Sequence, residues 1–160
     1  MPDSPIILAL DQSPTTCGFA VGQGSDLIYS TQICYQGKTR VRLLKMRAHV
    51  TDFVNRYQVK MLIVEHPVYI PRTGTTTFYK LAKLAGALDS LAVELGIVFI
   101  DDIWPPMVKT ALTGNHRATK TQMRRAAQQQ FTGRKTGEHE ADAIGVWLAG
   151  RVWLKKESMS

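Results

Sequence analysis

Residues 6–21 read Ile-Ile-Leu-Ala-Leu-Asp-Gln-Ser-Pro-Thr-Thr-Cys-Gly-Phe-Ala-Val, and the fold is organised around them. The apolar run Ile6–Leu10 is typical of a strand buried on both faces, and it ends on the charged Asp11. Turn-forming residues then lead into a second apolar run at Cys17–Gly22. Because an unpaired carboxylate is costly to bury, we expect Asp11 to reach solvent, a cation or a hydrogen-bond donor. A simpler role, in which Asp11 only caps the turn, explains this stretch equally well.

The length and composition predict one globular domain. A chain of 160 residues is long enough to bury a core, and we expect a single domain over residues 1–154 with a frayed tail over residues 155–160. No run approaches the roughly 20 apolar residues of a membrane span, and no signal peptide precedes the first strand. We therefore expect a cytoplasmic protein, of a bacterium or of a virus-infected cell, without a membrane partner.

The positive charge is unevenly distributed. The net charge is +7, and the stretch from Ile103 to Gly137 contains no acidic residue. The basic residues of that stretch are Lys109, Arg117, Lys120, Arg124, Arg125, Arg134 and Lys135. One-sided charge of this kind favours a polyanionic partner, although by itself it does not distinguish nucleic acid from an acidic membrane surface.

Hydrophobic periodicity predicts an α/β fold with a five-stranded mixed sheet flanked by helices. Three consecutive strands joined by short turns are expected to pair antiparallel. Apolar residues then recur at spacings of three and four between Leu43 and Tyr57, which predicts an amphipathic helix. The later strands are expected to be parallel to the first. The predicted strands are Ile6–Leu10, Cys17–Gly22, Leu27–Cys34, Met61–Val64 and Ile97–Ile100, and the later helices are Phe78–Leu95, Trp104–Leu112, Thr119–Phe131 and Glu138–Trp153.

Acidic residues follow two of these strands and open the last helix. If Met61–Val64 is parallel to the first strand, Glu65 and Asp11 lie at the same sheet edge, where ligands bind in α/β folds. The last helix begins with His139 and Asp142 on one face, three residues apart. Crowded carboxylates are stable only with cations between them, and oxygen ligands suit Mg²⁺ or Mn²⁺. Alternatively, acidic residues at a helix start only complement the helix dipole, which explains Glu138 better than Asp142.

Four segments together resemble the RuvC family of Holliday-junction resolvases, which have the RNase H-like fold. They are Ile-Leu-Ala-Leu-Asp11 with its turn, Leu-Ile-Val-Glu65, Lys-Leu-Ala-Lys-Leu-Ala-Gly86 and His139-Glu-Ala-Asp142-Ala. The resemblance runs from Ile6 to about Ala149 and extends to the order of the elements.

The resemblance implies a homodimeric endonuclease that uses two Mg²⁺ ions per active site, with Mn²⁺ as a substitute, to cut four-way and other branched DNA. It places Asp11, Glu65, His139 and Asp142 at the metal-ligand positions. It places Lys109 and Lys120 near the scissile phosphate and Tyr69 against unpaired bases at the crossover. With the basic residues around them, the expected DNA-binding set is Tyr69, Arg72, Lys109, Arg117, Lys120 and Arg124.

Some features of the sequence depart from this family and keep alternatives open. The turn after Asp11 is Gln-Ser-Pro-Thr-Thr, where the family usually has Pro-Gly, and the C-terminal tail is short, which is typical of a divergent branch of the family such as a viral one. The rival hypotheses are an RNA-processing nuclease of the same fold and a junction-binding module without activity. A third is a phosphotransferase, because Ala-Leu-Asp-Gln-x-x-Thr-Thr also resembles a phosphate loop of sugar kinases, although those enzymes need two such domains.

Overall fold

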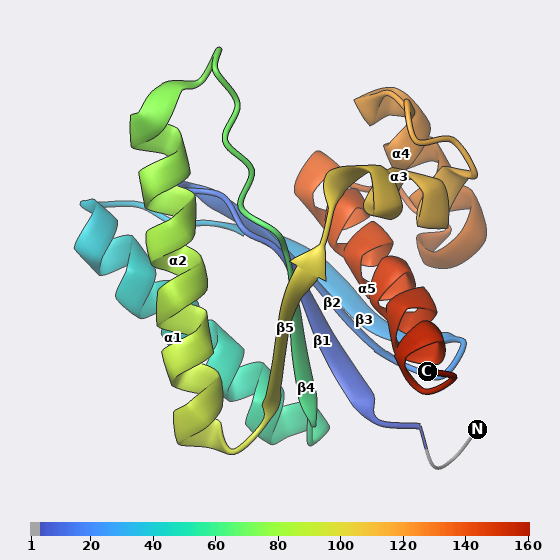
Figure 1. Cartoon of the computed structure of the whole chain (residues 1–160), viewed down its shortest axis with the longest axis horizontal. Coiled ribbons are helices and arrows are strands. Elements are labelled where there is room, and N and C mark those ends of the chain that lie inside the picture. The colour runs from blue at the N-terminus through green and yellow to red at the C-terminus, as the bar shows by residue number, and fades with distance from the viewer. Residues whose placement is uncertain (1–3) are drawn as a thin grey trace.

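The computed structural model describes residues 4–160 and forms a five-stranded sheet with helices on both faces (Figure 1). The strands are β1 (Ile6–Asp11), β2 (Thr16–Gln23), β3 (Asp26–Cys34), β4 (Met61–Glu65) and β5 (Val98–Ile103). The helices are α1 (Thr39–Tyr57), α2 (Gly74–Leu95), α3 (Pro105–Thr113), α4 (Lys120–Ala127), the π-helix η1 (Gln128–Thr132) and α5 (Glu138–Glu157).

The sheet has the predicted mixed topology, with the order β3-β2-β1-β4-β5. β1 pairs antiparallel with β2 and parallel with β4, and β4 pairs parallel with β5. Leu10 lies opposite Val64 in the β1–β4 register, so the next residues, Asp11 and Glu65, end adjacent strands at the same edge. The prediction that Asp11 and Glu65 lie at the same sheet edge is therefore confirmed.

Each face of the sheet has its own apolar core. Leu8 and Leu10 point towards α1 and α2, whereas Ile7 and Ala9 point towards α3, α4 and α5. Successive side chains of a strand point to opposite faces, so a strand covered on both sides is apolar at every position. Figure 1 shows α1 and α2 on one face and α5 lying across the other, with α3 and α4 beyond it.

The main differences from the predicted boundaries are at α2, β5, α4 and α5. α2 begins at Gly74, four residues earlier than predicted, and β5 continues through Asp101 and Asp102, whose charges interrupt its apolar pattern. β5 is an edge strand, where charged side chains reach solvent and are tolerated. The predicted helix Thr119–Phe131 changes from α to π geometry at Gln128. α5 extends to Glu157, so the first three residues of the tail expected to be frayed are helical.

Candidate active site at the carboxyl ends of the strands

Strand geometry directs Asp11 and Glu65 to the same side of the sheet. Asp11 follows Ile7 and Ala9 at spacings of two, and Glu65 follows Met61 and Ile63 in the same way. These preceding residues all pack on the α5 side of the sheet. Side chains that alternate with a period of two therefore carry both carboxylates to the face against which α5 packs.

The first turn of α5 brings the other predicted ligands to this edge. His139 Nδ1 lies 2.7 Å from Asp11 Oδ2, across 128 residues of sequence, and donates a hydrogen bond to it. Asp142 follows one turn later on the same helix and is half-buried. We call Asp11, Glu65, His139 and Asp142 the strand-end site.

Gly18 sets how closely α5 approaches β1, and the sequence analysis did not identify it as a site residue. It pairs with Asp11 across the β1–β2 register. A Cβ atom built on Gly18 would overlap the backbone carbonyl of His139 and crowd the amide of Glu140. Only glycine fits between β2 and the first turn of α5 with this backbone. The contact that identifies it joins segments far apart in sequence, so no local motif could have revealed it.

The carboxylates of the strand-end site perturb one another. Burial, with the negative charges of Asp11 and Asp142, raises the pKa of Glu65 to about 8, against the opposing charges of Lys120 and Lys109. Burial and the charge of Asp11 also raise the pKa of Asp142. The site therefore attracts positive charge, either as a proton or as a cation.

Two lysines and the imidazole supply that positive charge from the protein. Lys120 Nζ donates to Asp142 Oδ2 at 3.0 Å and to Glu138 Oε1 at 2.9 Å. Burial lowers the pKa of Lys120, but the charge of Asp142 and these hydrogen bonds outweigh that effect and raise the pKa. The hydrogen bond to Asp11 likewise raises the pKa of His139. Both predicted lysines act on the strand-end site, because the charge of Lys109 lowers the pKa of Glu65.

The donor atoms suit a hard divalent cation. Carboxylates of Asp11, Glu65 and Asp142 supply oxygen ligands, and His139 keeps Nε2 available because Nδ1 contacts Asp11. Gln12 adds a further oxygen, since its Oε1 is buried and has no hydrogen-bond partner among residues 4–160. The Gln12 Nε2 group lies 3.4 Å from the Glu65 carbonyl oxygen, which places this amide at the same edge. Such a set fits Mg²⁺ or Mn²⁺.

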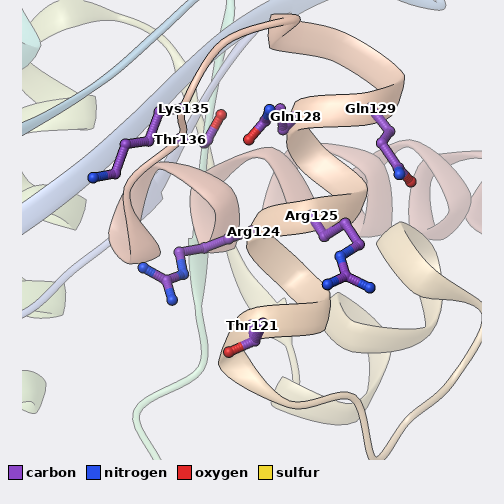
Figure 2. A pocket seen from close by; sticks show the side chains of 7 residues that line it. All are labelled: Thr121, Arg124, Arg125, Gln128, Gln129, Lys135 and Thr136. Carbon is purple, nitrogen blue, oxygen red and sulfur yellow. The ribbon is translucent and has the colours of Figure 1, made fainter.

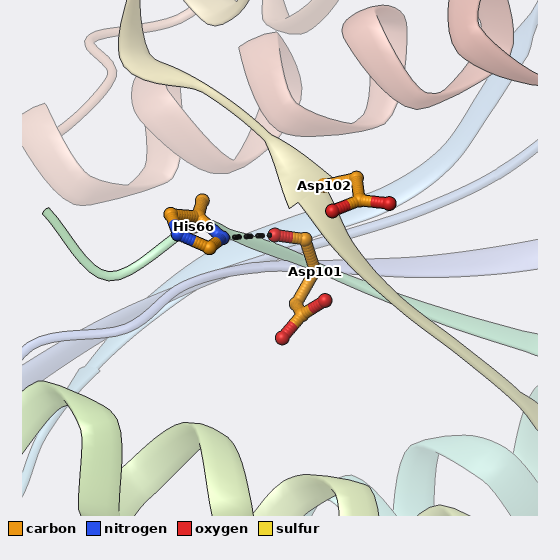
Figure 3. A group of neighbouring side chains, drawn as sticks. All are labelled: His66, Asp101 and Asp102. Carbon is orange, nitrogen blue, oxygen red and sulfur yellow. Dashed lines mark hydrogen bonds between the residues drawn. The ribbon is translucent and has the colours of Figure 1, made fainter.

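A second group of possible ligands lies at β5, and Figure 3 shows its members. One ligand atom each from His66, Asp101 and Asp102 lie within 4.8 Å of one another, and in the described part of the chain the strand-end residues do not form so compact a group. His66 Nδ1 is already 3.0 Å from the Asp101 carbonyl oxygen, and its ring stacks on Trp104 with centroids 4.2 Å apart. We call these three residues the His66 group. The structure thus has an acidic cluster, although the sequence analysis did not predict this one.

The remaining predicted DNA-binding residues are exposed. Tyr69 and Arg72 lie in the loop between β4 and α2, where the Tyr69 ring meets Phe78 edge-on. Arg117 lies in the turn before α4, and Arg124 lies on α4. None of these four contacts the strand-end site directly among the described residues, so they surround the carboxylates without joining them.

Three comparisons relate the chain to known proteins. The family model described as "Crossover junction endodeoxyribonuclease RuvC" matches residues 7–149. No curated protein is significantly similar in sequence.

Solved structures resemble the fold over nearly the whole chain. Thermus thermophilus RuvC in complex with a Holliday junction substrate is 21% identical with a TM-score of 0.78, and the likeness covers 96% of each chain. The Fowlpox virus resolvase bound to junction DNA is 15% identical with a TM-score of 0.61, covering 93% of this chain and 98% of that one. The yeast mitochondrial Holliday junction resolvase Ydc2 is 12% identical with a TM-score of 0.61, covering 94% and 80%. At these identities the likenesses establish the fold.

Proposed function

The chain belongs to the RuvC family of crossover junction endodeoxyribonucleases, and we propose that it cuts four-way and other branched DNA by metal-dependent hydrolysis of phosphodiester bonds. The family is metal-dependent, and the structure has acidic clusters that suit a metal. The observation that carries the proposal is the strand-end site, in which residues from β1, β4 and α5 converge on one sheet edge. Raised pKa values at Glu65, His139 and Asp142, on segments far apart in sequence, are typical of a catalytic site.

The reaction class follows from this donor set. Two bound Mg²⁺ ions, or Mn²⁺ in their place, would activate a water molecule and stabilise the leaving oxygen. The water oxygen bonds to phosphorus and the bond from phosphorus to the 3′ oxygen breaks, leaving a 5′-phosphate and a 3′-hydroxyl. Asp11, Glu65, Asp142 and His139 would hold these ions. Lys120, which already contacts Asp142, offsets the charge that builds on the phosphoryl oxygens, together with Lys109.

Resolution of a four-way junction needs two symmetric nicks, so the working unit is a twofold homodimer. Helix α2 supports this, because Tyr79 and Val93 are 66% and 77% exposed and lie on one side of that helix.

The exposed Tyr69 stacks on an unpaired base at the crossover, while Arg72, Arg117 and Arg124 contact phosphates. We propose that the protein acts in the cytoplasm of a bacterial or virus-infected cell. No helix in the described residues is long and apolar enough to cross a bilayer.

The test compares the wild-type protein with Asp11→Asn on a four-way junction, a linear DNA duplex and a structured RNA. With Mg²⁺ or Mn²⁺, the wild type is expected to cut the junction into nicked duplexes, and EDTA is expected to stop cleavage. Asp11→Asn keeps the shape of the side chain and removes its charge, so we expect it to bind the junction without cutting it. Cleavage by Asp11→Asn at the wild-type rate would remove Asp11 from the mechanism.

The other outcomes separate the remaining alternatives. Preferential cleavage of the RNA would identify an RNA-processing nuclease of the same fold. Junction binding that EDTA does not change, with no cleavage by any divalent ion, would identify a binding module without activity. The basic surface is compatible with a junction nuclease, an RNA-processing nuclease and a binding module without activity. The complete set of four predicted ligands favours an active nuclease.

A further inference from the structure

Five of the seven lysines and arginines between Ile103 and Gly137 form two groups. Lys120 is paired with Asp142 and Glu138 at the strand-end site. Arg134 Nη2 lies 2.6 Å from Oε1 of Glu140, which is 3% exposed, and also donates to the Ser30 carbonyl oxygen of β3. Both cations are therefore already paired with acidic groups of the protein.

The second group has no such partner. Arg124, Arg125 and Lys135 form no ion pair with any residue of the described part of the chain. They line a hollow of about 440 Å³ beside α4, with Thr121, Gln128 and Gln129 adding hydroxyl and amide groups. Figure 2 shows the Arg124 and Lys135 side chains on one side of it and Arg125 on the other. No carboxylate lines this α4 hollow among residues 4–160.

The turn that carries Lys135 is fixed in place. Thr136 is buried, and its Oγ1 donates to the Arg134 carbonyl oxygen at 2.9 Å and lies 2.6 Å from Thr132 Oγ1. The Arg134–Glu140 pair ties the same turn to α5. The backbone of Lys135 is thus held beside α4 by contacts on both sides, so little ordering entropy remains to be lost when a ligand binds there.

The α4 hollow continues the strand-end site along α4. Lys120 begins this helix, and Gln128 follows its last residue. At 1.5 Å per residue, the hollow extends to about 12 Å from Lys120 along the helix axis. One strand of B-DNA advances about 3.4 Å per nucleotide, so that reach corresponds to roughly two to four nucleotides. Arg124 connects the two regions, because it follows Lys120 by four residues and lies on the same side of α4.

We propose that the α4 hollow binds the sugar-phosphate backbone of one junction arm, two to four nucleotides from the scissile phosphate. This rests on the proposed function. The cations lie on both sides of the hollow, which suits a row of phosphates better than a single anion. The hollow lies along the last turns of α4, where the helix dipole disfavours anions, so the side chains supply the attraction. Its contacts are to phosphate, so they add affinity and register without reading base sequence.

The experiment measures junction binding by Arg125→Ala/Lys135→Ala. The matched control is Lys155→Ala/Lys156→Ala, which removes the same charge at the far end of α5, about 20–25 Å along the helix from His139 and Asp142. Fluorescence anisotropy with a labelled four-way junction in EDTA gives Kd between about 50 and 200 mM salt. We expect the hollow variant to bind about tenfold more weakly at the lower salt and to reduce the slope of log K against log salt by about 2. The control is expected to keep the wild-type slope.

Two further measurements make the outcome decisive. Methylphosphonate linkages two to four nucleotides from the cut should weaken binding of the wild type but not of the hollow variant. At saturating protein, the single-turnover rate of the hollow variant should stay within about twofold of the wild type, because its residues contact no reacting atom. If the hollow variant keeps the wild-type salt slope, the proposal that the α4 hollow binds the DNA backbone is wrong. A wild type that binds junctions without cutting them overturns the proposed function and leaves the binding test valid.

Discussion

Two groups of ionisable side chains lie at the same end of the sheet, and they differ in how they are built. The strand-end site joins β1, β4 and α5, and one of its hydrogen bonds spans 128 residues of sequence. The His66 group comes from the end of β4 and the adjacent strand β5, and its hydrogen bond spans 35 residues. Its ligand atoms are the more compact of the two, yet Asp102 is exposed and His66 stacks on Trp104.

The comparison teaches that compactness alone does not identify a catalytic site. Neighbouring acidic residues on an edge strand are near one another by connectivity and gain solvation at no structural cost. The strand-end site instead holds carboxylates together where burial and mutual repulsion raise the pKa of Glu65 and Asp142. Such an arrangement is stable when a bound cation offsets the repulsion between the carboxylates. We therefore assign the chemistry to the strand-end site rather than to the His66 group.

The largest expected difference between the two groups is in cleavage rate. Glu65→Gln removes a predicted metal ligand, and we expect the single-turnover rate on a four-way junction to fall about 1,000-fold or more, since each 1.36 kcal/mol of lost transition-state stabilisation costs a factor of ten. Asp102→Asn makes the same chemical change in the His66 group and should stay within about threefold of the wild type. A large loss in Asp102→Asn with little loss in Glu65→Gln would reverse the assignment.

Sequence reasoning predicted the parts of this comparison that local pattern determines. The apolar runs before Asp11 and Glu65, with the antiparallel and parallel pairing they imply, predicted the sheet edge at which these two carboxylates meet. The His139 and Asp142 pair followed from helical spacing. All four predicted ligands lie at that edge, as does Lys120, and Lys109 acts on Glu65 through its charge.

The parts that the sequence did not reveal depend on contacts between distant segments. Gly18 resembles any small residue in a strand until α5 is placed against it. In the sequence, Arg134 is not distinguishable from the other basic residues of its stretch. Its ion pair with the buried Glu140 shows that it has a structural role. Asp101 and Asp102 interrupted the apolar pattern of β5 and hid both the end of that strand and the His66 group.

The next largest effect concerns how each group is held. Gly18→Ala forces a methyl group into the α5 backbone beside His139, so we expect unfolding free energy to fall by about 3 kcal/mol and junction cleavage to fall with it. Gly86 lines a pocket with His66 and Asp101, and a Cβ there meets nothing within 4 Å. Gly86→Ala in helix α2 should therefore stabilise the protein by about 0.5–1 kcal/mol. Urea unfolding of both variants measures the difference, and equal changes would show that Gly18 does not limit the approach of α5.

The last expected difference is a pH dependence of stability that only the strand-end site should show. The pKa of Glu65 is about 8 in the folded protein and ordinary in the unfolded chain, so the folded state holds a proton that the unfolded state releases. Its contribution to stability is therefore lost as pH rises from about 4.5 to about 8. The raised pKa of His139 acts in the same direction, so the wild type is compared with Glu65→Gln, which keeps His139.

In EDTA, the Tm of Glu65→Gln should exceed that of the wild type by an amount that grows by about 3–5 °C per pH unit between about pH 5 and pH 8, because one pH unit in this window is worth about 1.4 kcal/mol and 1 kcal/mol corresponds to roughly 2–4 °C in a domain of this size. Mg²⁺ competes with the proton, so the rise in Tm that it gives the wild type should be larger at the higher pH and small in Glu65→Gln. Asp102→Asn should show neither trend. If its Tm follows pH and Mg²⁺ as that of Glu65→Gln does, burial at the strand ends is not what distinguishes the two groups.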